Sequence, residues 1–154
     1  MAYKVFISYS TRDLPSVDAL RGWLTLSDVE VFVSEYSVAP GAPLTPTIEA
    51  NIRNCDLFVL LWSHNARTSD WVPQEIGIAH AQNRVILPIV LQDGLELPGF
   101  IKDVRYIAAF RDPQSAAQQL RDYVASNSMI KHNQQAALLV LAIGGFIFWI
   151  LKKG

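Results

Sequence analysis

Residues 56–63 read DLFVLLWS, and residues 69–83 read SDWVPQEIGIAHAQN. The first stretch is apolar on both alternating faces, which is typical of a strand buried in the middle of a parallel sheet. The second stretch spaces its apolar residues at a helical period and predicts a helix over about residues 71–83, with Asp70 as its N-cap. A buried strand that leads directly into a helix predicts an α/β fold.

The same alternation continues on both sides of this unit. Four more strands are expected, over residues 3–9, 29–34, 85–91 and 104–110. Three more helices are expected, after Asp13, around residues 48–55 and over residues 114–126. Strands separated by helices pair in parallel through right-handed crossovers, so the sequence predicts an open five-stranded parallel sheet flanked by helices. Such sheets bind ligands beyond the carboxyl ends of their strands.

The composition excludes several classes of protein. Hydrophobic residues make up 51% of the chain and charged residues 18%, which excludes intrinsic disorder as a description of the whole chain. The single cysteine excludes a disulfide scaffold. The net charge of −1 and the pI of about 6.3 argue against a nucleic-acid partner.

A continuous apolar run occupies residues 136–151, AALLVLAIGGFIFWIL, and Lys152 and Lys153 follow it. As a helix, these residues reach about 24 Å, short of the ~30 Å hydrocarbon core of a bilayer. Polar residues before the run and snorkelling lysines after it can extend the span. The run shows no polar stripe, so we expect a single-pass transmembrane helix in contact with lipid. A buried or oligomer-interface helix is the alternative.

The expected organisation has three parts: a domain over residues 1–126, a linker over 127–135 and the hydrophobic helix over 136–151. All fourteen acidic residues lie at or before Asp122, so the domain is acidic and the tail basic. The sequence starts MAYKVFISYS and shows no signal peptide. We therefore expect a protein anchored in the membrane by its C-terminus, with the domain in the cytoplasm.

Several familiar sites are excluded by the residues at the strand ends. A phosphate-accepting receiver domain needs acids after the first and third strands, where this chain has SYS and WSH. A dinucleotide-binding fold needs GxGxxG after the first strand, where this chain has STRD. His64, His80 and His132 lack metal-ligand spacing, so no metal site is predicted.

Trp71 and Glu75 are separated by four residues and therefore share one face at the start of the predicted helix. A glutamate at a helix start is common because the macrodipole favours negative charge there. A lone tryptophan is more often a packing residue than a platform for a ligand. The spacing alone does not decide between structural and functional roles.

Taken in order, these segments resemble the Toll/interleukin-1 receptor (TIR) domain family. The resemblance rests on VFISYSTRD (5–13), VEVFVSEYSVAPG (29–41), NCDLFVLLWS (54–63), SDWVPQEIGIA (69–79) and VILPIVL (85–91). It covers roughly residues 1–126 and implies an open, flavodoxin-like TIR sheet. The segment 69–79 is most similar to the TIR proteins that cleave NAD+.

The resemblance also implies roles for individual residues. The catalytic glutamate of the NAD-cleaving members corresponds to Glu75, with Trp71 beside it. Tyr9 and Ser10 then line the substrate pocket, and Ser34 is expected to bind substrate at the start of the loop. The loop 34–44 resembles the BB loop, which in this family mediates head-to-tail assembly. Ser34 stands where many members have Asp, so the likeness is weaker for this loop than for Glu75.

The function implied by the resemblance is that of an NAD+ glycohydrolase active on assembly. It would release nicotinamide together with ADP-ribose or a cyclic ADP-ribose isomer, in anti-phage or immune-type defence. NAD+ is then the substrate, and no cofactor is expected. The expected partners are other copies of the chain, membrane lipid and another defence protein. Two alternatives stay open: a non-catalytic TIR scaffold or adaptor, and an effector that perturbs membranes when its TIR domain clusters.

Overall fold

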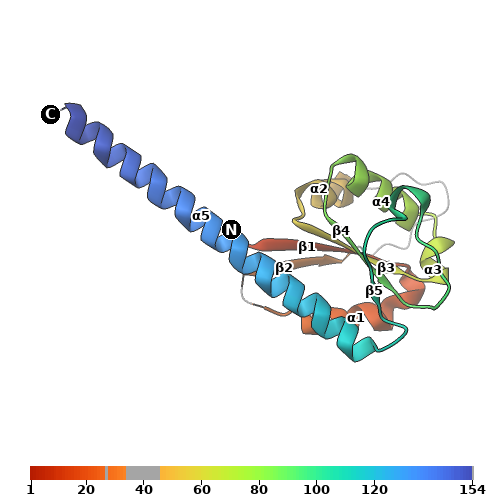
Figure 1. The fold of residues 1–154 in the computed structure, drawn as a ribbon. Coiled ribbons are helices and arrows are strands. Elements are labelled where there is room, and N and C mark those ends of the chain that lie inside the picture. Colours follow the sequence, from red (N-terminus) through yellow and green to blue (C-terminus); the bar gives the residue numbers. More distant parts are fainter. Residues whose placement is uncertain (27, 34–45, 154) are drawn as a thin grey trace.

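The fold is that of a computed structural model, which describes residues 1–26, 28–33 and 46–153, with side chains up to residue 139. Five strands form one sheet in the order β2-β1-β3-β4-β5, and every neighbouring pair is parallel (Figure 1). The strands are β1 (Tyr3–Ser8), β2 (Val29–Val33), β3 (Leu57–Trp62), β4 (Ile86–Val90) and β5 (Ile107–Ala108). The predicted open parallel sheet flanked by helices is confirmed.

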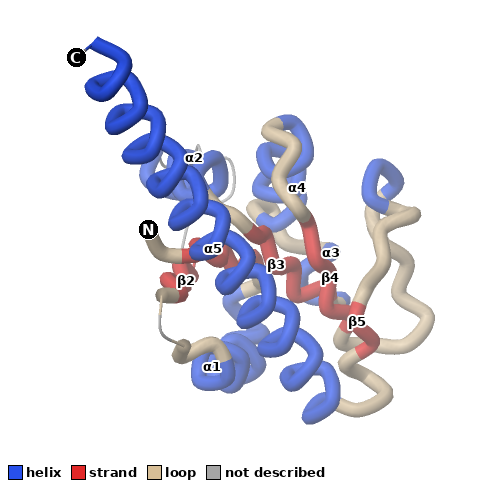
Figure 2. The backbone as a smooth tube through the Cα atoms, turned by 60° about the vertical axis from the view of Figure 1, so that its left-hand side comes forward, coloured by secondary structure: helices blue, strands red, loops and turns tan. Residues whose placement is uncertain are grey.

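Helices cover both faces of this sheet. They are η1 (Thr11–Asp13), α1 (Leu14–Trp23), α2 (Pro46–Asn54), α3 (His64–Arg67), α4 (Val72–Ala81), η2 (Gly99–Ile101) and α5 (Pro113–Lys153). Helices α1 and α5 lie on one face, and α2 and α4 lie on the other (Figure 2). The apolar pattern of the strands requires this arrangement, because β3 is buried along its whole length and needs cover on both sides.

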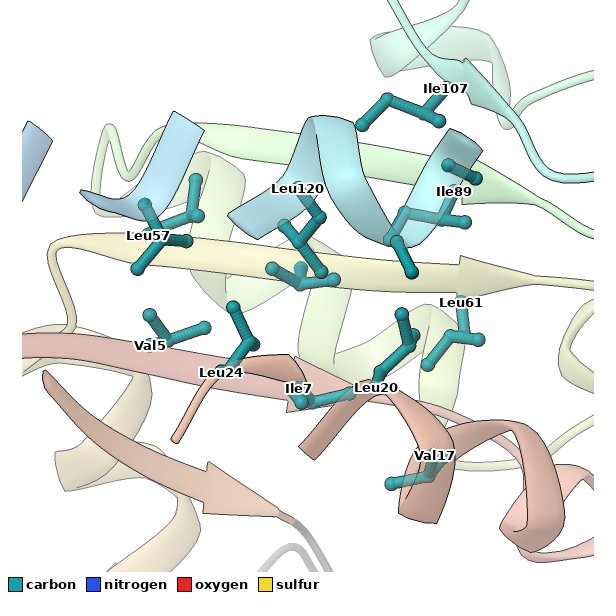
Figure 3. Close-up of a cluster of buried hydrophobic side chains, with 14 of the residues drawn as sticks. Val5, Ile7, Val17, Leu20, Leu24, Leu57, Leu61, Ile89, Ile107 and Leu120 are labelled. Atoms are coloured by element: carbon teal, nitrogen blue, oxygen red, sulfur yellow. The ribbon is translucent and has the colours of Figure 1, made fainter. Parts of the chain in front are cut away.

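Each face has its own hydrophobic cluster. Under α1 and α5, side chains such as Ile7, Leu61 and Ile89 pack against Leu20 and Leu120 (Figure 3). The second cluster lies under α2 and α4 and draws on the alternate strand positions: its larger members include Phe6, Phe58, Leu60, Trp62 and Ile76. Burying one such aliphatic side chain contributes about 1.5–3 kcal/mol, so these two layers provide most of the driving force for folding.

The first turn of α4 differs from the prediction. The expected N-cap, Asp70, is exposed and does not cap the helix. Instead, Ser69 Oγ accepts hydrogen bonds from the backbone N–H groups of Trp71 at 3.2 Å and Val72 at 3.4 Å. Serine and aspartate are equally good caps, so sequence alone could not choose between neighbouring residues.

Two further elements differ in length. The predicted strand over residues 104–110 is reduced to the two residues of β5, because only Ile107 and Ala108 pair with β4. Short strands are usual at the edge of a sheet, where an unpaired backbone would otherwise be exposed.

The short helix α3 was not predicted. Its N-cap is Ser63, whose Oγ accepts from the N–H of Ala66 at 3.0 Å.

Helix α5 is continuous over 41 residues. The expected helix end near residue 126 is wrong, since α5 passes unbroken through residues 127–135, which contain neither glycine nor proline to end it. The division into domain, linker and tail stays a prediction. Within the described residues, no helix combines the length and the apolar character needed to cross a membrane. The side chains of most of the predicted membrane helix, from residue 140 onward, lie outside the described residues.

Candidate functional site

Glu75 lies in the first turn of α4 and is completely buried. Its backbone N–H donates to the carbonyl of Trp71 at 3.0 Å, which fixes the glutamate one turn into the helix. Ser8 Oγ donates a hydrogen bond of 3.2 Å to Glu75 Oε1, and Ser8 is also fully buried. Ser8 is the last residue of β1, so Glu75 sits at the edge of the sheet where strands end, which we call the carboxyl edge.

Trp71 directly precedes α4 and is 7% exposed. It is one helical turn from Glu75, so both side chains start from the same side of the helix. The hydrogen bond from the Trp71 N–H to Ser69 Oγ fixes the backbone at this point. The predicted place of Trp71 and Glu75 at a helix start is therefore confirmed, while their roles toward a substrate stay predictions.

A second buried polar group joins the ends of β1 and β3. Asp13 closes η1, and its carboxylate accepts hydrogen bonds from Ser63 Oγ and, at 2.9 Å, from Asn65 Nδ2. Ser63 follows β3 directly and is fully buried. Nearby, the backbone N–H of His64 donates to Gln92 Oε1 at 2.9 Å. These bonds hold the segments after β1, β3 and β4 in place around the carboxyl edge.

The other predicted site residues are distributed differently. Ser10 is buried and caps η1, since its Oγ accepts from the N–H of Arg12 at 3.3 Å. Tyr9 is 5% exposed and belongs to the hydrophobic cluster under α1 and α5. Ser34 and the loop 34–44 lie outside the described residues, so their roles remain predictions.

Sequence reasoning did not identify Ser8 as a site residue. The signal was present: Ser8 directly follows the apolar residues Val5, Phe6 and Ile7 of the strand. A hydroxyl in that position needs a hydrogen-bond partner when the strand is buried. Asp13 and Ser63 were likewise not predicted as site residues, although both are buried here.

Two opposing effects act on the Glu75 carboxylate. Its place in the first turn of α4 favours the charged form, because the positive end of the helix dipole lies there. Full burial disfavours the charged form, because water no longer solvates it. The Ser8 hydroxyl offsets part of that loss of solvation. Among the described residues, no group of three or more His, Cys, Asp or Glu side chains is placed to hold a metal ion.

A cavity of about 760 Å³ opens at the carboxyl edge on the other face of the sheet, between α1 and the first turn of α5. Its walls include Trp23, Leu91 and Phe110, and Asp13 lies at its border. Glu75 is not among its described lining residues. Asp13 and Gln92 therefore belong both to the polar network around the carboxyl edge and to the wall of this cavity.

A family model described as "TIR domain" matches residues 5–124. The chain belongs to the TIR-domain family. The match begins within β1 and ends at residue 124 of α5, so the rest of that helix lies outside it. A comparison with curated proteins found no match.

Solved structures share this TIR fold at low sequence identity. The TIR domain of the Toll-related receptor TRR-2 from Hydra magnipapillata has a TM-score of 0.63 and 20% identity, over 80% of this chain and 99% of that one. The Clostridium botulinum CMP N-glycosidase BcmB has a TM-score of 0.56 and 20% identity, over 78% and 98%. The TIR domains of the activated Roq1 resistosome, which recognises the effector XopQ, have a TM-score of 0.50 and 16% identity, over 81% and 82%.

Proposed function

We propose that this TIR domain is an NAD+ glycohydrolase that uses Glu75 as its reactive carboxylate. The observation that carries the proposal is the buried contact between Ser8 and Glu75 at the carboxyl edge, with Trp71 one turn away. A fully buried glutamate is a poor choice for stability alone, and ionisable groups held in this way concentrate at functional sites.

The chemistry needs only one carboxylate. The nicotinamide of NAD+ is already cationic, so the bond between its nitrogen and the ribose carbon breaks with the electron pair going to nicotinamide. No general acid is needed for this leaving group, in contrast to an ordinary glycoside. Glu75 stabilises the oxocarbenium-like transition state, or its carboxylate bonds to the ribose carbon as nicotinamide leaves and is itself displaced in the next step. Water then gives ADP-ribose and a proton, and attack by the adenine gives a cyclic isomer.

The full burial of Glu75 supports activation by assembly. A carboxylate without exposed surface cannot reach the ribose carbon of a bound nucleotide, so the single chain represents a resting arrangement. We propose that TIR–TIR contacts through the loop 34–44 open this site. The Roq1 structure is that of TIR domains in an activated resistosome, which supports assembly as a mode of action for this fold.

BcmB is a CMP N-glycosidase, and such an enzyme also breaks a bond between ribose and a ring nitrogen. Because its identity to this chain is only 20%, the likeness concerns the fold, and the substrate must be tested directly. NAD+ is favoured over CMP because its leaving group is a cation before the bond breaks. The test should therefore offer both nucleotides to the same preparation.

The experiment compares the full chain with Glu75→Gln and Glu49→Gln at high protein concentration, and it measures nicotinamide release from NAD+ and cytosine release from CMP. Both glutamates lie in the first turn of a helix, but Glu49 is on α2 and pairs with exposed Arg53. We expect Glu75→Gln to lose turnover by at least about 100-fold, as for removal of a principal transition-state stabiliser. Glu49→Gln should keep it. Full NAD+ cleavage by folded Glu75→Gln would refute the assignment.

We further propose that residues 136–151 attach the protein to a membrane as a single-pass helix, with the TIR domain in the cytoplasm and a second defence protein as a further partner. The hydrophobic character of this run supports membrane attachment.

A TIR scaffold or adaptor without catalysis is the first competing function, and an effector whose tail perturbs the membrane on clustering is the second. No nicotinamide release under any assembly condition would favour the scaffold, while toxicity of the tail alone would favour the membrane effector.

A further inference from the structure

Helix α5 leaves the domain at the edge opposite to Glu75. It begins at Pro113, just after β5, and so starts at the carboxyl edge. Eighteen residues later, Lys131 Nζ donates to the carbonyl of Ala2 at 2.9 Å and to Asp56 Oδ2 at 2.7 Å. Ala2 precedes β1 and Asp56 precedes β3, so this contact lies at the edge where the strands begin, which we call the amino edge. Beyond it, α5 extends away from the sheet (Figure 1).

The amino edge exposes apolar side chains around this exit. Met129 and Ile130 on α5 are 67% and 52% exposed. Val85 is 53% exposed at the start of β4, where its carbonyl accepts from the N–H of Phe58. Further along α5, Leu138 and Leu139 are 66% and 62% exposed. Large exposed apolar groups that gather on one side of a protein mark a surface that contacts something other than water.

The distance along α5 identifies the environment of these side chains. Ala136, the start of the apolar run, is five positions after Lys131, which corresponds to about 7.5 Å along a helix. The headgroup region on each side of a bilayer is about 5–8 Å thick. If the run starts at the hydrocarbon boundary, Lys131 and the amino edge lie at the level of the headgroups. Basic side chains suit that level, and Arg84 and Lys131 are both present there.

We propose that the amino edge of the sheet lies against the surface of a phospholipid bilayer, so that the carboxyl edge with Glu75 points away from the membrane. This rests on the proposed membrane attachment through residues 136–151. Its occupant is lipid rather than protein because the helix that carries Met129 and Ile130 continues unbroken into that run. The six residues of β3 span about 20 Å, which separates the reactive edge from the bilayer surface.

This orientation has a consequence for regulation of the proposed site. The carboxyl edge and the cavity between α1 and the first turn of α5 stay accessible to dissolved nucleotide and to neighbouring TIR domains. The continuous helix couples the domain to the bilayer, so all membrane-bound copies share one orientation. Copies held in one orientation in a plane meet through their sides more readily than free copies do.

The test places one fluorescent label at each edge of the full chain in phospholipid vesicles with nitroxide-labelled headgroups. Val85→Cys puts the label at the amino edge, and His64→Cys puts it directly after β3 at the carboxyl edge. The native Cys55 is 2% exposed and does not compete for the label. We expect loss of most of the fluorescence at position 85 and no loss at position 64.

Membrane insertion is measured in the same vesicles by resistance to carbonate extraction. Insertion with equal quenching at both positions, or with stronger quenching at position 64, overturns the orientation and leaves the attachment intact. Failure to insert overturns both. A flexible Gly-Ser segment inserted after Gln135 supplies the control, because it uncouples the domain from the bilayer. The contrast between the two labels should then fall, and an unchanged contrast would overturn the role of the rigid helix.

Discussion

At the scale of single residues, the contact between Ser8 and Glu75 is the point on which the proposed site depends. Both side chains are fully buried, so water cannot take the place of the lost hydrogen-bond partner when one of them is removed. We predict that Ser8→Ala lowers the free energy of unfolding by about 1–3 kcal/mol, the usual penalty for leaving a buried partner without its hydrogen bond. Urea unfolding of the full chain measures this change.

A double-mutant cycle isolates the contact from the volume lost at Ser8. Ser8→Ala combined with Glu75→Met, which has no strong acceptor at this place, should destabilise the protein by less than the sum of the two single changes, with a coupling on the order of 1 kcal/mol. Strict additivity would show that the bond from Ser8 Oγ contributes nothing to holding Glu75. The exposed Ser115 provides a matched serine, and Ser115→Ala should show no coupling with Glu75→Met.

Cys55 provides a pH-dependent prediction that does not involve the proposed site. Burial raises the pKa of its thiol from the ordinary 9.0 to about 11. The unfolded chain therefore releases the thiol proton at lower pH than the folded chain. The stability that the buried, protonated thiol contributes is fully present below pH 9 and is lost as the pH rises toward 11. The loss at pH 10 is on the order of 1 kcal/mol. The free energy of unfolding measured at pH 8 and pH 10 should show this loss. In Cys55→Ala, the part of the pH dependence that comes from the thiol should be absent.

Residue-scale prediction from sequence succeeded where one element carries the signal. Trp71 and Glu75 belong to one helix start, so their spacing alone places them on one side. Ser8 and Glu75 are 67 positions apart, and only the crossover geometry of β1 and α4 brings them together. Asp13 and Ser63 are 50 positions apart and pose the same difficulty. Contacts between elements depend on exact register, which a single sequence does not determine.

At the scale of elements, a polar contact holds α5 at the amino edge, beyond the apolar packing of its first turns. Lys131 joins the helix to Asp56 and to the carbonyl of Ala2, and the Asp56 carboxylate also accepts from the N–H of Lys4 at 2.8 Å. The Lys131 and Asp56 side chains are 23% and 28% exposed, so solvent screens the pair only in part. This partial burial makes the contact stronger than an ordinary surface ion pair.

We predict that Lys131→Met lowers the free energy of unfolding by about 1 kcal/mol, since a partly buried charged hydrogen bond is lost. Backbone amides around residues 127–135 should also exchange hydrogen faster, because α5 is then held to the body only by its earlier turns. Arg121→Met changes an exposed residue of the same helix and should leave both quantities unchanged. Equal exchange in the two variants would contradict the anchoring role of Lys131.

The elements themselves were largely predictable because burial determines their pattern. The apolar run of β3 and the helical spacing in α4 reflect cover on both faces of the sheet. The short edge strand β5 was overestimated, since Val104 and Phe110 are apolar because they pack against the second cluster and not because they pair in the sheet. The continuity of α5 was missed because a change in composition near residue 127 does not end a helix without a residue that breaks it.

At the scale of the whole molecule, the described core of the domain ends well before the apolar run begins. The last buried apolar side chain of α5 within the described residues is Val124, and the polar contact of Lys131 follows. The tail can therefore be removed after Gln135 without touching either hydrophobic cluster. Residues 1–135 consequently provide a comparison with the full chain that separates catalysis from membrane attachment.

If the buried Glu75 opens only when TIR domains meet, nicotinamide release per protein molecule should rise with protein concentration for residues 1–135. The full chain in vesicles should reach the same rate per molecule at a total concentration at least about 100-fold lower, because confinement raises the effective concentration of neighbours. Adding lipid at constant protein spreads the copies over more surface and should lower the rate again. A rate per molecule that is independent of both concentration and lipid area would show that one chain opens the site by itself.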